Sequence, residues 1–167
     1  MKLLTLIRHA KSSWNYSGLD DHDRPLNTRG EEAAPRMGLT LAERGDFAPD
    51  LILTSTALRT STTAGLIAEA VGYDPGEIVR EPAIYLASLP TLIAIIRALD
   101  EGHQHVVLCG HNPGFEDLVN HFLRNDTTER MPTCAVARLR LDLEHWGEVH
   151  EGCATLIEFL TPKILGG

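Results

Sequence analysis

The sequence contains few cysteines and no long hydrophobic run. Its three cysteines, Cys109, Cys134 and Cys153, are odd in number and scattered, and no two have the Cys-x-x-Cys spacing. This pattern argues against a disulfide framework or a zinc site and indicates reduced thiols in a cytoplasmic protein. No stretch approaches the roughly 18 apolar residues of a membrane span, and the apolar run at 3–7 is too short for a signal peptide.

Positive charge is also scarce. Lysine and arginine total 15 against 23 aspartates and glutamates, which gives a formal net charge of −8. A chain with this balance repels nucleic acid and anionic membranes at long range, so neither is expected as a partner. The 167 residues, 43 % hydrophobic and 23 % charged, predict one globular domain over residues 1–167 that can fold without a metal or a disulfide. We expect this domain to be a monomer.

Three short apolar runs, each ended by polar residues, predict buried strands. They lie at 3–7, 50–54 and 105–109. Because nearly every position in them is apolar, they are typical of parallel strands that are covered on both faces. Residues 137–143 instead alternate between apolar and polar side chains, which predicts a half-exposed antiparallel strand near the edge of the sheet. Residues 155–160 predict a second late strand.

Helical patterns lie between the apolar runs. Thr28 and Glu31 match a T-x-x-E capping box at the start of a first helix, although Pro35 falls inside it. Such a proline predicts either a kink or a later start of the helix. A second helix is expected over 57–70, after capping residues that begin at Ser55.

Two further helices complete the predicted layout. Ser88 is the expected cap of a third helix. Asn112 and Pro113 predict the start of a fourth, with the asparagine as N-cap and the proline at the first helical position. Alternating strands and helices predict an α/β fold, a three-layer α/β/α sandwich with a mainly parallel sheet and antiparallel C-terminal strands.

Cationic and titratable residues follow each of the three buried runs. Arg8 and His9 follow the first, Arg59 lies shortly after the second, and His111 follows the third. Ligands of open α/β sheets bind at the carboxyl ends of the strands, so these four side chains are expected to meet in one pocket. Each residue alone is a weak signal, and the combination carries the prediction.

Arg59 is expected in the first turn of its helix, where the positive end of the helix dipole disfavours arginine. An anion bound there would resolve this conflict, because the guanidinium and the helix N-terminus would both contact it. Two arginines suit a phosphoryl group, and a neighbouring histidine can attack phosphorus to form a phosphohistidine. A second histidine can stabilise the charge on the phosphoryl oxygens.

These motifs resemble those of the histidine phosphatase (phosphoglycerate mutase-like) superfamily. The resemblance spans residues 3–114 in the family's order, and it is greatest for the small phosphohistidine phosphatases of the SixA type. The matching segments are Arg8-His9-Ala10-Lys11-Ser12-Ser13-Trp14-Asn15, Arg24-Pro25-Leu26, Ser55-Thr56-Ala57-Leu58-Arg59 and Gly110-His111-Asn112-Pro113-Gly114. Alanine stands at position 10 where the family has glycine, which raises the question of how the turn after His9 is built.

The resemblance implies a phosphatase with a phosphoglycerate mutase-like fold and no metal or other cofactor. It implies His9 as the nucleophile, with Arg8, Arg59 and His111 completing the phosphate pocket. Arg24 is a candidate phosphate ligand, and the alternative is that it pairs with a nearby aspartate in its turn.

The remaining candidates are less specific. Glu81 is the first candidate for the general acid that an ester substrate requires, with Asp21 or Asp23 as the second. Ser12 and Asn15 are candidates to line the pocket, although hydrogen bonds within their own loop explain these polar residues almost as well.

The expected substrate is a phosphohistidine in a protein, because protonated imidazole leaves more readily than an alkoxide. The short stretch at 71–87 leaves no room for the helical lid of the mutases, which suits a protein substrate. The nearest alternative is a phosphatase of small phosphate esters. Two others are a metal-dependent hydrolase, using residues 20–23 and 103–105, and a phosphoprotein-binding module without activity.

Overall fold

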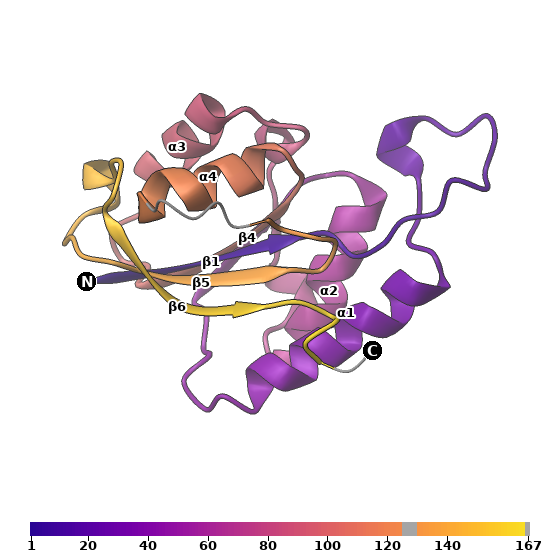
Figure 1. The fold of residues 1–167 in the computed structure, drawn as a ribbon, viewed down its shortest axis with the longest axis horizontal. Coiled ribbons are helices and arrows are strands. Elements are labelled where there is room, and N and C mark those ends of the chain that lie inside the picture. Colours follow the sequence, from indigo (N-terminus) through magenta and orange to yellow (C-terminus); the bar gives the residue numbers. More distant parts are fainter. Residues whose placement is uncertain (125–129, 166–167) are drawn as a thin grey trace.

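The computed structural model describes residues 1–124 and 130–165, which form a six-stranded sheet with helices on both faces (Figure 1). The strand order is β3-β2-β4-β1-β5-β6. The strands are β1 (Lys2–Arg8), β2 (Leu51–Thr54), β3 (Val79–Arg80), β4 (His105–Gly110), β5 (Val136–Leu141) and β6 (Ala154–Leu160). The helices are α1 (Thr28–Ala42), α2 (Leu58–Val71), α3 (Leu89–Arg97) and α4 (Gly114–Leu123). No helix among the described residues is long and apolar enough to cross a membrane.

The centre of the sheet is parallel, as the apolar runs predict. Strand β1 pairs in parallel with β4, which pairs in parallel with β2. Alternate residues of β1 enter two separate cores: Leu4 and Leu6 pack with α3 and α4, whereas Ile7 packs with α1 and α2. Figure 1 shows the two helix pairs on opposite faces of the sheet, so the three-layer α/β/α prediction is confirmed.

The prediction for the first C-terminal strand is wrong in its exposure and in its bounds. Strand β5 covers 136–141 rather than 137–143. It lies between β1 and the edge strand β6, so its predicted place near the edge of the sheet is confirmed. Both of its pairings are antiparallel, as expected. The alternation is misleading because Arg138 is buried and forms ion pairs with Glu158 and Asp46. The edge strand is β6, close to its predicted range.

Two helix caps differ from the prediction by one residue. Asn27, rather than Thr28, is the N-cap of α1, and its side chain accepts a hydrogen bond from the Gly30 amide. Helix α1 continues through Pro35 from Thr28 to Ala42, so the proline does not delay its start. Helix α4 begins at Gly114, one residue after its expected first position.

The side chains expected to cap α4 and α2 accept hydrogen bonds from nearby backbone amides, as predicted. Asn112 Oδ1 accepts from the Glu116 amide at 3.2 Å, and Ser55 Oγ accepts from the Ala57 amide at 3.2 Å. Ser88 is the N-cap of α3, yet its hydroxyl contacts Thr91 Oγ1 and not a backbone amide.

The register of the central strands aligns their carboxyl ends. Arg8 lies opposite Gly110 across the β1–β4 pair, and Thr54 lies opposite Cys109 across the β2–β4 pair. The residues that follow these three strands therefore emerge at one edge of the sheet, where α2 and α4 begin.

Candidate active site

The structure brings Arg8, His9, Arg59 and His111 together at the carboxyl ends of β1, β2 and β4. Arg8 is the last residue of β1, and the His9 amide donates to the Gly110 carbonyl at 3.1 Å. The imidazole rings of His9 and His111 are 5.3 Å apart between centroids. Arg59 Nη2 is 3.5 Å from His111 Nδ1. The four side chains that the sequence selects thus share one site.

His9 is held as a neutral imidazole whose second nitrogen makes no hydrogen bond to the residues that the structure describes. Its Nδ1 donates to the Ala10 carbonyl at 2.7 Å, which leaves the lone pair on Nε2. Burial lowers the pKa of His9 to about 4, against the effect of that hydrogen bond, and the charges of Arg59, Arg8 and Arg24 lower it further. The ring is therefore deprotonated at neutral pH, as a nucleophile must be.

His111 is also neutral in this state. Burial lowers its pKa to about 3, and His9 and Arg59 contribute. Because Arg59 can only donate, His111 Nδ1 faces it as the acceptor, and Nε2 carries the proton toward Ser55 Oγ at 2.7 Å. His111 can therefore donate to a phosphoryl oxygen from Nδ1 only after it takes up a proton there.

Each of the two site arginines keeps one buried N–H group unpaired among the described residues. Arg8 Nη1 donates to the Met131 carbonyl at 3.0 Å, and Arg59 donates through Nη1 and Nη2 to Asp21. Neither Arg8 Nε nor Arg59 Nε has a hydrogen-bond partner there. Buried unpaired donors are costly, and they are a known feature of ligand sites. Two such donors beside His9 fit an oxyanion.

Asp21 connects the site arginines, a role that the sequence did not reveal. Its carboxylate accepts from Arg59 Nη2 at 3.0 Å, from Arg24 Nε at 3.1 Å and from the Tyr85 hydroxyl at 2.6 Å. Burial alone would raise the pKa of Asp21, but these hydrogen bonds, led by that of Tyr85, lower it to about 2. An acid with this pKa has no proton to give at neutral pH, which disfavours Asp21 as the general acid.

Tyr85 is a site residue that sequence reasoning missed. Its ring packs edge-on against His111, with the centroids 5.4 Å apart, and against His22 at 4.9 Å. It follows β3, a two-residue strand that is too short to give an apolar pattern. Reading the residues after every strand would have found Tyr85 only if β3 had been recognised.

Arg24 is buried, and its Nε and Nη1 groups donate to residues of the protein. It pairs with Asp21 and donates through Nη1 to Ser12 Oγ at 2.8 Å and to the Ser13 carbonyl at 3.0 Å. Its guanidinium lies 3.5 Å from the centroid of the Trp14 ring. The pairing with an aspartate, the alternative to phosphate binding, is thus present, while the positive charge of Arg24 acts on His9.

The other candidates lie near the site without contacting its four central residues. The Glu81 amide donates to the Thr54 carbonyl at 2.8 Å, but its carboxylate has no hydrogen bond to the described site residues. Asp23 is exposed and lies 3.6 Å from His22. Ser12 is a partner of Arg24, whereas Asn15 is exposed and its amide donates to Ser13 Oγ.

Ala10 fits the turn after His9 without strain. The only non-glycine residues of the described chain with positive φ are Leu86, Arg124 and Cys134, so Ala10 does not adopt the conformation that favours glycine. Its amide donates to Thr63 Oγ1 at 3.0 Å, and its methyl group is fully buried in the core beneath α1 and α2.

The residues proposed for a metal-dependent reaction do not converge. His105 opens β4, at the opposite end of that strand from His111, and contacts Thr5 Oγ1 at 2.9 Å. The Asp21 carboxylate already accepts hydrogen bonds from Arg59, Arg24 and Tyr85. Within residues 1–124 and 130–165, no group of three or more histidine, cysteine, aspartate or glutamate side chains could hold a metal ion.

Comparison with known proteins identifies the family of this chain. The model of the histidine phosphatase superfamily (branch 1) matches residues 4–84. An uncharacterized protein of Mycobacterium tuberculosis is 32 % identical over 167 residues, which cover 94 % of this chain and 100 % of that protein. A 2,3-bisphosphoglycerate-dependent phosphoglycerate mutase of Thermobifida fusca is 42 % identical over 74 residues, 43 % of this chain and 30 % of that enzyme.

Solved structures agree over nearly the whole chain. A structure from Agrobacterium tumefaciens, assigned as a phosphohistidine phosphatase SixA, is 33 % identical. It superposes with a TM-score of 0.81 over 96 % of this chain and 98 % of that one. The chain therefore belongs to the histidine phosphatase superfamily, and its fold is of the SixA type. This membership supports phosphatase activity.

Proposed function

We propose that the protein is a metal-independent phosphatase that removes phosphate from phosphohistidine in proteins through a phosphohistidine intermediate on His9. One observation carries the proposal. The Nε2 lone pair of His9 lies in a site where Arg8 and Arg59 each keep a buried Nε–H group without a partner among the described residues. A phosphoryl group would accept from both arginines while its phosphorus faces the nucleophile.

In the first step, a bond forms between His9 Nε2 and phosphorus, and the phosphorus–nitrogen bond of the substrate breaks. A substrate imidazole that carries a proton on its other nitrogen leaves as neutral imidazole. The proton on His9 Nδ1 stays at the Ala10 carbonyl, 2.7 Å away. The phosphorylated ring of His9 is therefore itself protonated and prepared to leave in the next step.

In the second step, water adds to phosphorus and the bond to His9 Nε2 breaks. The products are inorganic phosphate, which retains both protons of the water, and neutral His9 with its proton on Nδ1. The negative phosphoryl group raises the pKa of His111, whose Nδ1 then takes up a proton and donates to a phosphoryl oxygen. Arg8 and Arg59 neutralise the remaining charge.

The absence of a well-placed acid favours a nitrogen leaving group over an ester. Asp21 is ionised, with its pKa lowered to about 2 by Tyr85 and the two arginines, and Glu81 makes no hydrogen bond to the described site residues. An alkoxide needs a proton from such an acid, whereas neutral imidazole does not. Hydrolysis of small phosphate esters through Glu81 is the second candidate function.

Access to the site suits a protein substrate. Between α2 and α3 the chain forms only short elements, namely the 3₁₀ turns Pro75–Glu77 and Pro82–Ile84 and the two-residue strand β3. These elements leave no helical lid in that connection. A phosphohistidine on a protein surface could thus approach His9 from the carboxyl ends of the central strands.

The test compares phosphate release from a phosphohistidine protein and from alkyl phosphate esters, with EDTA present throughout. We expect the phosphohistidine protein to be the better substrate and labelled phosphate to be trapped on His9 of the wild type but not of His9→Gln. A preference for esters would overturn the substrate assignment. Binding of the phosphoprotein without turnover would indicate a binding module, and loss of activity in EDTA would indicate a metal-dependent reaction.

A further inference from the structure

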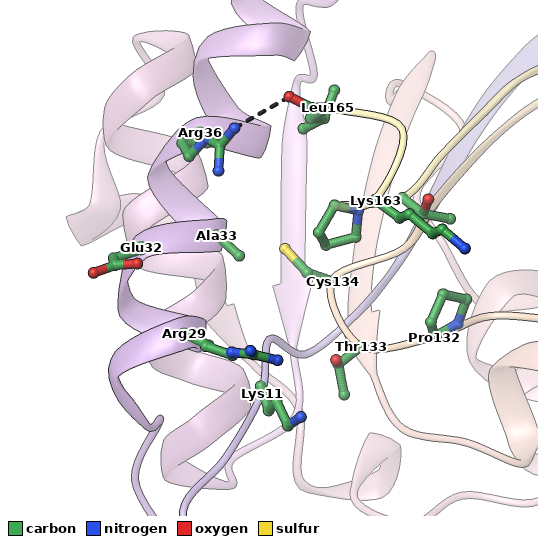
Figure 2. Close-up of a pocket in the computed structure, with 12 residues that line it drawn as sticks. Lys11, Arg29, Glu32, Ala33, Arg36, Pro132, Thr133, Cys134, Lys163 and Leu165 are labelled. Carbon is green, nitrogen blue, oxygen red and sulfur yellow. Dashed lines mark hydrogen bonds between the residues drawn. The ribbon is translucent and has the colours of Figure 1, made fainter. Parts of the chain in front are cut away.

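A second, basic cleft opens beside the active site. It has a volume of about 490 Å³ and lies between the first half of α1, residues 132–134 and the C-terminal residues 161–165 (Figure 2). Four cationic side chains line it: Lys11, Arg29, Arg36 and Lys163. The one acidic residue in the lining is Glu32, and Figure 2 shows its carboxylate pointing away from the cleft.

None of the four cations of this cleft forms an ion pair with a described residue, and Arg36 donates to the Leu165 carbonyl at 3.1 Å. Lys11 and Arg29 form no ion pair or hydrogen bond through their side chains with residues 1–124 or 130–165. Figure 2 shows both side chains at the same end of the cleft, near the hydroxyl of Thr133. In a chain with a net charge of −8, such a concentration of unpaired cations is complementary to an acidic ligand.

Two residues that line the cleft, Lys11 and Cys134, are connected to His9 through the backbone. Lys11 follows His9 by two residues, so their Cα atoms lie within about 7 Å of each other. The Cys134 amide donates to the carbonyls of both Arg8 and His9, at 3.1 and 2.9 Å. On the other side, the Lys11 carbonyl accepts from the Asn27 amide at 2.9 Å, which fixes the start of α1 against the same loop.

The floor of the cleft is apolar. Ala33, Pro132, Cys134 and Leu165 contribute to the lining, and Figure 2 shows the Cys134 sulfur directed toward Ala33. A bare inorganic anion would gain nothing from this surface. An acidic peptide segment suits it better, because its carboxylates can contact the cations while its apolar atoms cover the floor.

We propose that this cleft docks an acidic segment of the phosphorylated partner protein, with carboxylates two to four residues from the phosphohistidine. An extended chain spans about 7–13 Å over two to four residues, which is enough to reach from His9 to Lys11, whose Cα atoms lie within about 7 Å of each other. The proposal rests on the proposed function, since it assumes a phosphohistidine protein as substrate. It assigns Lys11 and Arg29 to substrate selection.

The test uses two phosphohistidine peptides that differ only in this flank, one with aspartates and glutamates and one with asparagines and glutamines. For the wild type we expect kcat/KM to favour the acidic peptide about tenfold at 0.1 M salt. Lys11→Gln combined with Arg29→Gln should bring this ratio close to one. The matched control is Arg140→Gln, which removes an exposed arginine of β5 that pairs with Asp142.

Salt gives an independent measure of the same contact. The preference for the acidic peptide should shrink as salt rises, because the screening length falls from about 10 Å at 0.1 M to about 3 Å at 1 M. A ratio near one in the wild type, or an unchanged ratio in the double variant, would overturn the docking proposal.

A labelled acidic peptide without phosphate separates this proposal from the proposed function. If neither phosphohistidine peptide is hydrolysed, the proposed function fails, and the binding measurement still decides the docking site. Binding that weakens about tenfold in the double variant but not in Arg140→Gln would support the cleft as an acidic-peptide site. Equal binding by all three proteins would refute it.

Discussion

The protonation state of His9 gives the most direct test of the active-site chemistry. Burial of the ring, with the charges of Arg59, Arg8 and Arg24, lowers its pKa to about 4. A histidine with the ordinary pKa of about 6.5 would be about 9 % neutral at pH 5.5, whereas one with a pKa of about 4 would be about 97 % neutral. Acidification from pH 7.5 to 5.5 would thus lower the neutral, nucleophilic fraction of an ordinary histidine about tenfold, and that of His9 by only a few per cent.

The assay is an NMR titration of the labelled imidazole rings in phosphate-free buffer, with His9→Gln used to assign the signal. We expect the His9 resonance to hold its position from pH 7.5 to 5.5 and to move only below about pH 5. Arg59→Gln should raise the pKa of His9, because it removes the first of the three repelling charges. A midpoint near 6.5 in the wild type would refute the account of a buried, neutral nucleophile.

Three further predictions concern the surroundings of the site. Asp21→Asn should bind inorganic phosphate severalfold more tightly in calorimetry, because no carboxylate competes for Arg59. Its free energy of unfolding in urea should fall by about 1 kcal/mol: the pKa change from 3.8 to about 2 corresponds to at most about 2.5 kcal/mol, and the 42 % exposure of the side chain reduces this through solvent screening. Ala10→Gly should lower the unfolding free energy by about 1–2 kcal/mol, because it removes a buried methyl group and frees the unfolded backbone. Stability should also fall as pH drops from about 6.5 to 4, because His9, His105 and His111 all have lowered folded-state pKa values and the unfolded chain binds more protons there. A flat stability profile over that range would contradict those three pKa values.

The central part of the site could be predicted because it depends on simple features of parallel sheets. Strands buried on both faces are apolar throughout, so β1, β2 and β4 stand out in the sequence. Once they are parallel neighbours, the residues after them must meet at one edge. Arg8, His9, Arg59 and His111 follow from this rule, without knowledge of any side-chain contact.

The parts that were missed depend on contacts between residues that are distant in sequence. Arg138 is polar in the strand pattern but buried in the structure, because Asp46 and Glu158 neutralise it. From the sequence, Asp21 could either pair with a nearby arginine or donate a proton. The hydrogen bond from Tyr85, 64 residues later in the chain, helps to keep its carboxylate ionised as an acceptor. No local sequence pattern predicts contacts of this kind.

The net charge of the site explains how these contacts favour binding of a phosphoryl group. Arg8, Arg24 and Arg59 contribute three positive charges. Asp21 contacts two of these arginines and Glu116 acts on the third, so the net charge of the group is +1 with both histidines neutral. Asp21 gives the buried Arg59 the partner that an isolated buried charge requires, and it leaves the Nε group unpaired among the described residues. A phosphoryl group of about −2 changes this net charge to about −1, and the protonated imidazole that carries the group, in the substrate or in phosphorylated His9, brings it back to about zero. An acidic protein can therefore bind an anion, because the balance of charge that matters is within the pocket.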